Sequence, residues 1–408
     1  MNPLADFLAD FLADPGRAPF AGAAPAVSWR QDDDADWQRT LAAAGAQALE
    51  LARRGRSHGR IALLPAALGR AQWPRPSQAR HLWERARPMR LADALGDGLR
   101  DWRNELHRAL LRADDVSTPA GLGHWLGAAL GGRGARFSPG PPLDRTDAER
   151  DIGRVAVRDG SHPVRTLWVK SARLSTFAGD TSLRLRFGFG AEGADDGSLD
   201  EPSHRAVAAL ARAACPEIAL VEGARELWSL VESAAGAKLY PTGAIVYWNA
   251  PQGGARMHHD AFRPDDGTGQ RGVLYTQLVG RTFWLTLSSA DLGRRLVEFA
   301  ELVLAGEMPW LRGELDGVDF EALAALGDDP RALADELGQP DQGRWGKLVD
   351  RGPEFTLFLV DSGHGVLLDA GDAILLPNHG LARTALHSVF CASGGRTLAT
   401  SFGLRLAR

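Results

Sequence analysis

Residues 245–260 read IVYWNAPQGGARMHHD, and this stretch decides the fold class that the sequence predicts. The run Ile245–Asn249 consists mostly of β-branched and aromatic residues and stops before Pro251, which indicates a strand that ends in a turn. The Gly253-Gly254 pair then leads into a second short run. Two short strands joined through a glycine turn predict antiparallel β structure here.

The second of these strands carries a candidate metal site. In an extended strand, residues i and i+2 share a face, so His258 and Asp260 point the same way and His259 points away. One imidazole and one carboxylate, joined by an imidazole from a distant strand, form the 2-His-1-carboxylate triad that holds Fe(II) and leaves the opposite face open. We expect His387 to supply the second imidazole, because it opens an apolar, strand-like run.

The rest of the chain predicts an α+β fold. Helices are expected at 35–56, 78–113, 117–130, 203–214 and 223–235. Strands are expected at 154–158, 166–169, 182–187, 243–249, 254–261, 272–279, 281–287, 355–361, 364–368, 372–377, 386–391 and 396–405. Many short strands separated by turns predict a double-stranded β-helix, that is, a jelly-roll or cupin barrel.

A change in composition divides the chain into two expected regions. The segment from Gly131 to Pro142 is rich in glycine and proline and breaks the helical pattern. We therefore expect a helical N-terminal region at 1–145 and a barrel at 146–408, with a helical insertion at about 289–350.

Composition limits the partners and the compartment. The net charge of −4 offers no basic excess for phosphates, which argues against nucleic acid as a partner, and no run approaches the ~18 apolar residues that span a bilayer. Two cysteines, Cys215 and Cys391, are too few for a disulfide framework, so we expect a reducing cytoplasm. Lys170, Lys238 and Lys347 are the only lysines among 47 basic residues, a bias typical of GC-rich bacterial genomes.

Three ordered motifs resemble a known enzyme family. His258-x-Asp260 is followed by Gln277-x-x-Gly280-x-Thr282-x-Trp284, and Gly371-Asp372 opens a strand that ends at Pro377 before His387. This order is similar to that of the JmjC-like, cupin-type Fe(II)/2-oxoglutarate-dependent oxygenases, over about residues 240–405. The resemblance implies that His258, Asp260 and His387 are iron ligands. His379 competes with His387, since the family places its distal histidine four or five residues after the proline and neither residue fits.

The cosubstrate site departs from the family pattern. Thr282 occupies the position of the lysine that commonly binds the distal carboxylate of 2-oxoglutarate, and a threonine hydroxyl cannot neutralise a carboxylate. Arg396, nine residues after His387, is the first candidate to replace it, because related oxygenases place a carboxylate-binding arginine about that far after the distal histidine. Arg281 and Arg256 are further candidates. Neutral groups expected to line the same pocket are Tyr247, Asn249 and Gln277.

Together these observations predict a dioxygenase that hydroxylates a C–H bond of a peptide, an amino acid or a small metabolite. The implied cofactors are Fe(II) and the cosubstrate 2-oxoglutarate, and the resemblance allows a homodimer. The alternative is a cupin-fold metal-binding protein or metalloenzyme that does not use 2-oxoglutarate, which the missing lysine keeps open. A third hypothesis is an interaction protein with a degenerate barrel.

Overall fold

Two antiparallel sheets organise the part of the chain described by the structure, which is a computed structural model. The description covers residues 73–130, 136–139, 151–158, 166–172, 181–189, 201–251, 253–261, 269–307, 318–329, 332, 336, 345, 348–349, 353–380 and 383–407. The fold is therefore α+β, as expected. The two sheets are hydrogen-bonded separately and do not close into one barrel.

The larger sheet has nine strands in the order β1-β11-β8-β13-β6-β5-β4-β3-β2. Their bounds, in that order, are Met89–Leu91, Ala373–Pro377, Gly272–Val279, Thr397–Leu406, Leu239–Asn249, Leu183–Phe189, Thr166–Ala172, Asp151–Arg158 and Arg136–Pro139. Each neighbouring pair is antiparallel. The sheet thus joins strands from both expected regions.

The smaller sheet has four strands in the order β10-β9-β12-β7. Their bounds are Gly365–Leu368, Thr282–Ser288, Ala385–Cys391 and Gly254–His259. From β6 onward the chain passes back and forth between the sheets, so that β7, β9, β10 and β12 lie in the smaller one and β6, β8, β11 and β13 in the larger.

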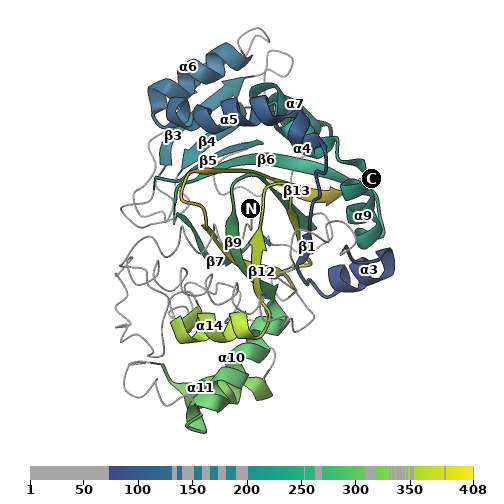
Figure 1. Ribbon diagram of the computed structural model, residues 1–408, viewed down its shortest axis with the longest axis vertical. Helices are drawn as coiled ribbons and strands as arrows, with labels where there is room; N and C mark the ends of the chain where they lie inside the picture. The colour runs from purple at the N-terminus through teal and green to yellow at the C-terminus, as the bar shows by residue number, and fades with distance from the viewer. Residues whose placement is uncertain are drawn as a thin grey trace.

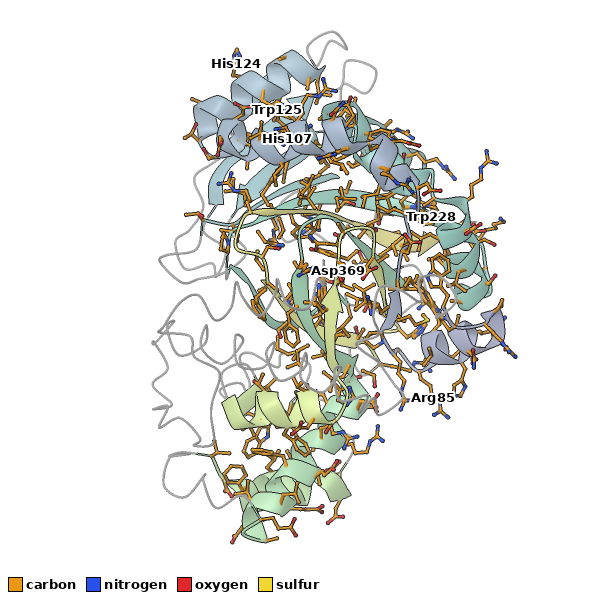
Figure 2. All side chains as sticks on the ribbon, in the orientation of Figure 1. Arg85, His107, His124, Trp125, Trp228 and Asp369 are labelled. Atoms are coloured by element: carbon orange, nitrogen blue, oxygen red, sulfur yellow. The ribbon has the colours of Figure 1, made fainter. Side chains whose placement is uncertain are left out.

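Helices cover the outer faces of both sheets (Figure 1). The helices α3 to α9 span Pro76–Glu84, Gly98–Asp101, Arg103–Val116, Pro119–Leu130, Glu201–Ala214, Ile218–Glu222 and Arg225–Ala235. His107, His124 and Trp125 belong to α5 and α6, in the helical layer at the top of the molecule (Figure 2). Below the four-stranded sheet lie α10, α11 and α14, which span Ser289–Leu304, Phe320–Ala325 and Pro353–Asp361. Within the described residues, no helix is long and apolar enough to cross a membrane.

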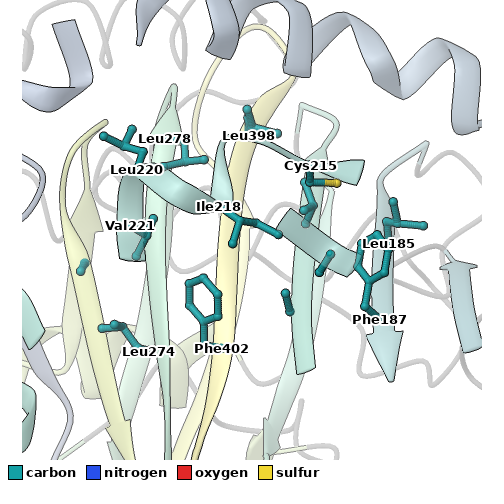
Figure 3. Packing of buried hydrophobic residues seen from close by; sticks show 14 of the residues in the cluster. Leu185, Phe187, Cys215, Ile218, Leu220, Val221, Leu274, Leu278, Leu398 and Phe402 are labelled. Carbon is teal, nitrogen blue, oxygen red and sulfur yellow. The ribbon is translucent and has the colours of Figure 1, made fainter. Parts of the chain in front are cut away.

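Apolar alternation explains why the nine-stranded sheet carries helices on one face. Leu185 and Phe187 of β5 are fully buried, as is Phe402 of β13, and they pack with Ile218 and Val221 of α8 (Figure 3). The side chains between them in each strand point to the other face. One face of the sheet is therefore core, and the other is available to line the space between the sheets.

Polar contacts connect Trp83 and Arg90 to Asp372 and His379, which flank β11. We call these four residues the clamp. Arg90 Nη2 lies 2.7 Å from Asp372 Oδ2, and both side chains are less than one-tenth exposed. His379 Nε2 lies 2.7 Å from the carbonyl oxygen of Trp83. The clamp therefore consists of hydrogen-bonded polar groups, of which the Arg90–Asp372 pair is buried and His379 is half-buried.

Two secondary-structure predictions are wrong. The expected strand 355–361 is helix α14, because Pro353 opens a helical turn and the Phe355 and Phe358 rings pack against Phe299, at 5.2 and 5.5 Å between ring centroids. The expected helix 78–113 is interrupted by β1, which pairs with β11. The expected helix 35–56 lies outside the described residues.

The other expectations within the described residues are confirmed as elements, including the strands flanking the His-x-Asp motif. The insertion predicted at about 289–350 is helical where it is described, at α10 and α11. The N-terminal region is not only helical, since β1 and β2 fall within it. The domain boundary stays a prediction.

Candidate metal site

His258, Asp260 and His387 meet between the two sheets. His387 of β12 is the register partner of His258 in β7, and Asp260 follows the last residue of β7. One ligand atom from each of the three side chains lies within 4.8 Å of the other two. The imidazole rings of His258 and His387 are 4.2 Å apart between centroids, and His387 Nε2 lies 3.8 Å from Asp260 Oδ2. The three residues could therefore hold one metal ion.

These residues line a cavity of about 130 Å³. Its walls come from both sheets: Tyr247 and Asn249 from β6, Ser401 from β13, Tyr275 from β8 and Trp284 from β9. The cavity also borders two arginines of β5, Arg184 and Arg186. The site thus combines a triad with neutral hydrogen-bonding groups and positive charge.

The electrostatic environment suits a divalent cation. Burial, together with the field of His258, lowers the pKa of His387 to about 3, so this imidazole is neutral near pH 7. Burial alone would raise the pKa of Asp260, but the nearby His387, His258 and His259 outweigh it and lower the pKa overall. Neutral imidazole and ionised carboxylate are the forms that bind metals. His387 Nδ1 is buried and has no hydrogen-bond partner among the described residues.

Of the two competing histidines, His387 lines the cavity with His258 and Asp260, and His379 does not. His379 Nε2 lies 2.7 Å from the carbonyl oxygen of Trp83, and because a carbonyl oxygen only accepts, Nε2 is the donor. Its ring also packs edge-on against Trp83. His379 belongs to the clamp and does not line the cavity. His259 turns away from the triad, and its Nδ1 accepts a hydrogen bond from the Ala261 amide.

Thr282 and Gln277 form an internal hydrogen-bond chain. Thr282 Oγ1 donates to Gln277 Oε1 at 2.8 Å and accepts from Trp284 Nε1 at 2.9 Å. Thr282 and Gln277 are both fully buried, and neither lines the cavity. Trp284 stacks on His387, with 5.3 Å between ring centroids and 28° between ring planes. Thr282 therefore fixes the indole of Trp284, which in turn packs on His387.

Two of the three arginines singled out in the sequence, Arg396 and Arg281, lie away from the cavity. Arg396 pairs with Asp114 at 2.9 Å and does not line the cavity. Arg281 pairs with Asp369 at 2.5 Å and is likewise absent from the lining. The side chain of Arg256 lies outside the described part of the protein. Tyr247 and Asn249 do line the cavity, as expected.

Sequence reasoning missed Arg184 and Arg186. They alternate with the buried Leu183, Leu185 and Phe187 along β5, so the two arginines share the opposite face. Arg184 is the register partner of Tyr247, whose hydroxyl oxygen lies 2.9 Å from Ser401 Oγ. The alternation was visible in the sequence, but the cavity that this face borders was not.

The chain was compared with models of known protein families and with curated proteins, and it matches none of them. The functional assignment therefore rests on the site.

Proposed function

We propose that the protein is a mononuclear non-haem Fe(II), 2-oxoglutarate-dependent oxygenase that hydroxylates a C–H bond. The observation that carries this proposal is the convergence of His258, Asp260 and His387 on one cavity, with ligand atoms within 4.8 Å of one another. Two imidazoles and one carboxylate with an open face are the donor set of non-haem Fe(II) oxygenases.

The strand order supports a double-stranded β-helix. Eight successive strands, β6 to β13, divide into β11-β8-β13-β6 and β10-β9-β12-β7, four in each sheet. Two facing four-stranded antiparallel sheets built from eight consecutive strands are the pattern of a jelly roll. In this arrangement the pairing of β7 with β12 brings a His-x-Asp motif and a distant histidine together.

The residues of the triad would hold the iron; near pH 7 His387 is neutral and Asp260 is ionised, which are the forms that bind a metal. Bound Fe(II) would supply the site at which the substrate C–H bond, 2-oxoglutarate and dioxygen are converted to the hydroxylated product, succinate and CO₂. Trp284 packs flat on His387 and is itself fixed by Thr282, so the ring orientation of this ligand is set before metal binds.

The cosubstrate needs a cation for its distal carboxylate, because a buried carboxylate without one is costly. We assign this role to Arg184, since Arg396 is paired with Asp114 and does not line the cavity. Arg184 is half-buried, borders the cavity and lies opposite Tyr247. An arginine fork can bind a carboxylate bidentately, with the Tyr247 hydroxyl and the Asn249 amide as neutral partners.

The test is succinate formation from 2-oxoglutarate by the Fe(II)-loaded protein. The variant Asp260→Ala should lose both tight Fe(II) binding and succinate formation. Asp97→Ala is a matched control, because this carboxylate is 87% exposed and lies outside the cavity. Full succinate production by Asp260→Ala would sink the assignment. Tight iron binding by the wild type without any succinate would favour the alternative, a metalloprotein that does not use 2-oxoglutarate.

A further inference from the structure

We infer that His259 and Gln270 are positioning residues for Asp260, because together they hold the peptide unit that follows this candidate metal ligand and so orient its carboxylate before metal binds. This peptide unit joins Asp260 to Ala261, and we call it the 260–261 peptide. The inference rests on the proposed function, since it concerns the metal site on which that function depends.

Asp260 is the member of the triad that lies outside the strand ladder. His258 and His387 are register partners in β7 and β12, so the ladder fixes the backbone of both residues. Strand β7 ends at His259, one residue before Asp260. The Asp260 side chain is 36% exposed, whereas the His387 side chain is 6% exposed. Contacts other than the ladder must therefore keep the Asp260 carboxylate beside the two imidazoles.

Two side chains hold the 260–261 peptide, one at its carbonyl and one at its amide. Gln270 Nε2 donates a hydrogen bond to the carbonyl oxygen of Asp260 at 3.3 Å. The amide N–H of Ala261 donates to His259 Nδ1 at 3.2 Å. The carbonyl and the N–H belong to one planar peptide unit, so the two hydrogen bonds together fix its orientation. Because His259 is paired with Leu386 in the ladder, the Asp260 Cα is held on both sides.

The side chain of Gln270 is itself held against β13. It is half-buried and borders the cavity. A Cβ atom placed on Gly403 would lie 2.4 Å from Gln270 Oε1 and 2.7 Å from Thr242 Oγ1, so glycine is what allows this close approach. The next residue, Arg271, donates its backbone amide to the carbonyl oxygen of Leu404 at 2.7 Å. Gln270 thus connects the larger sheet to a candidate metal ligand at the end of a strand of the smaller sheet.

Support of this kind acts on metal affinity. A ligand that is already held in place loses less conformational freedom when the metal binds. Replacing a residue that orients a metal ligand typically weakens metal binding by about 10- to 100-fold. Neither His259 nor Gln270 belongs to the triad, so substitutions at these two positions change the orientation of Asp260 and leave the donor set intact.

The first experiment measures anaerobic Fe(II) binding by the full chain and by Gln270→Met. Methionine is similar in length but cannot donate to the Asp260 carbonyl, so the affinity should fall by about 10- to 100-fold. The matched control is Gln78→Met on α3, where Gln78 is exposed and its Oε1 accepts from the Arg75 amide at 3.0 Å. The control also loses a side chain–backbone hydrogen bond, but away from the cavity, and it should bind Fe(II) as the wild type does.

Two variants at His259 separate the hydrogen bond from the imidazole. His259→Leu removes the acceptor of the Ala261 amide and should weaken Fe(II) binding to a similar extent as Gln270→Met. An asparagine side chain can accept from the amide two residues further on, so His259→Asn should keep most of the affinity. If His259→Asn lost as much affinity as His259→Leu, the hydrogen bond to Ala261 would not be the reason, and the role assigned to His259 would be wrong.

Two further measurements distinguish positioning from a general structural role. The visible spectrum of the Co(II)-loaded protein reports the coordination geometry, and it should change in Gln270→Met and His259→Leu. It should be the same in the wild type, in His259→Asn and in Gln78→Met. Urea unfolding of the metal-free variants should show a loss of no more than about 1.5 kcal/mol in the free energy of unfolding, the net contribution of one hydrogen bond.

The outcomes separate this inference from the proposed function. Unchanged Fe(II) affinity and Co(II) spectra in both Gln270→Met and His259→Leu would overturn the inference and leave the proposed function standing. An equal loss of affinity in Gln78→Met would also overturn it. A wild type that binds Fe(II) without forming succinate would refute the oxygenase alone. A wild type that binds no Fe(II) would refute the metal site, and the inference with it.

Discussion

The candidate metal site and the clamp both contain histidine and aspartate side chains, but the environments of these side chains differ. In the metal site, His258, Asp260 and His387 line a cavity and lie near one another. In the clamp, the Asp372 carboxylate accepts hydrogen bonds from Arg90, from the Asp93 amide and from the Asp369 amide. A histidine or aspartate whose polar atoms are used by the fold has a structural role, whereas one that faces a cavity can hold a ligand.

The comparison also separates two histidines that the sequence left in competition. His379 Nε2 is bonded to the Trp83 carbonyl, while His387 Nδ1 is buried without a partner among the described residues. Buried polar atoms are normally satisfied, and an exception calls for an explanation. His387 also lines the cavity, with its Nε2 3.8 Å from Asp260 Oδ2, whereas the Nε2 of His379 is used by the fold.

The largest expected effect comes from the histidines. His387→Ala should abolish tight Fe(II) binding, because it removes a ligand, and His379→Ala should leave iron binding intact. Anaerobic Fe(II) titration of the two variants measures this directly. If His379→Ala lost iron binding and His387→Ala kept it, His379 would be the iron ligand and His387 would have the structural role.

The next effect concerns stability. Asp372→Ala removes the carboxylate that pairs with the Arg90 guanidinium, which is only 8% exposed. Removing one member of a buried ion pair costs about 3–5 kcal/mol, so the free energy of unfolding should fall by about that amount. Urea unfolding measures it, and Fe(II) binding by the folded variant should be unchanged. A loss below about 1 kcal/mol, the range of an exposed pair, would show that the clamp is not structural.

A third prediction compares two arginines. Arg184→Met should weaken 2-oxoglutarate binding by about 10- to 100-fold, since a hydrogen bond to a charged group contributes about 1.5–3 kcal/mol. Arg396→Met should leave it unchanged, because Arg396 is outside the cavity. Titration of the Fe(II)-loaded protein with 2-oxoglutarate gives both affinities. A loss confined to Arg396→Met would return the anchoring role to that residue.

The smallest expected effect is the stability cost of His379→Ala. The variant loses one hydrogen bond and an aromatic contact with Trp83, so we expect a loss of about 1–2 kcal/mol in the free energy of unfolding. Urea unfolding of this variant beside Asp372→Ala compares the two clamp residues. A cost larger than that of Asp372→Ala would reverse their order of importance.

The sequence predicted the strands and the face on which a side chain lies better than the contacts that the side chain makes. The strand period placed His258 and Asp260 on one face. Two of the predicted strands pair with each other as β7 and β12, and this pairing brings His387 next to His258 and Asp260. The run 355–361 was misassigned because its β-branched and aromatic residues favour a strand, whereas packing of Phe355 on Phe299 selects a helix.

Residue roles that depend on distant partners were beyond the sequence. Nothing local to Arg396 indicates that Asp114, on helix α5, pairs with it. The sequence of β5 alternates between apolar residues and arginine, but only the register of β5 with β6 relates Arg184 to Tyr247 and the cavity. Thr282 stands where the resembled family commonly has a lysine, and its hydrogen bonds to Gln277 and Trp284 give this departure a structural reason.

We propose that the three cavity residues bind Fe(II) together with 2-oxoglutarate. The most direct measurement is the visible absorption spectrum after anaerobic addition of Fe(II) and then 2-oxoglutarate to the apoprotein. We predict a weak metal-to-ligand charge-transfer band that appears in the wild type and in His379→Ala, and is absent in His387→Ala. A wild-type protein that binds iron but forms no band contradicts the cosubstrate assignment, and one that binds neither contradicts the metal site itself.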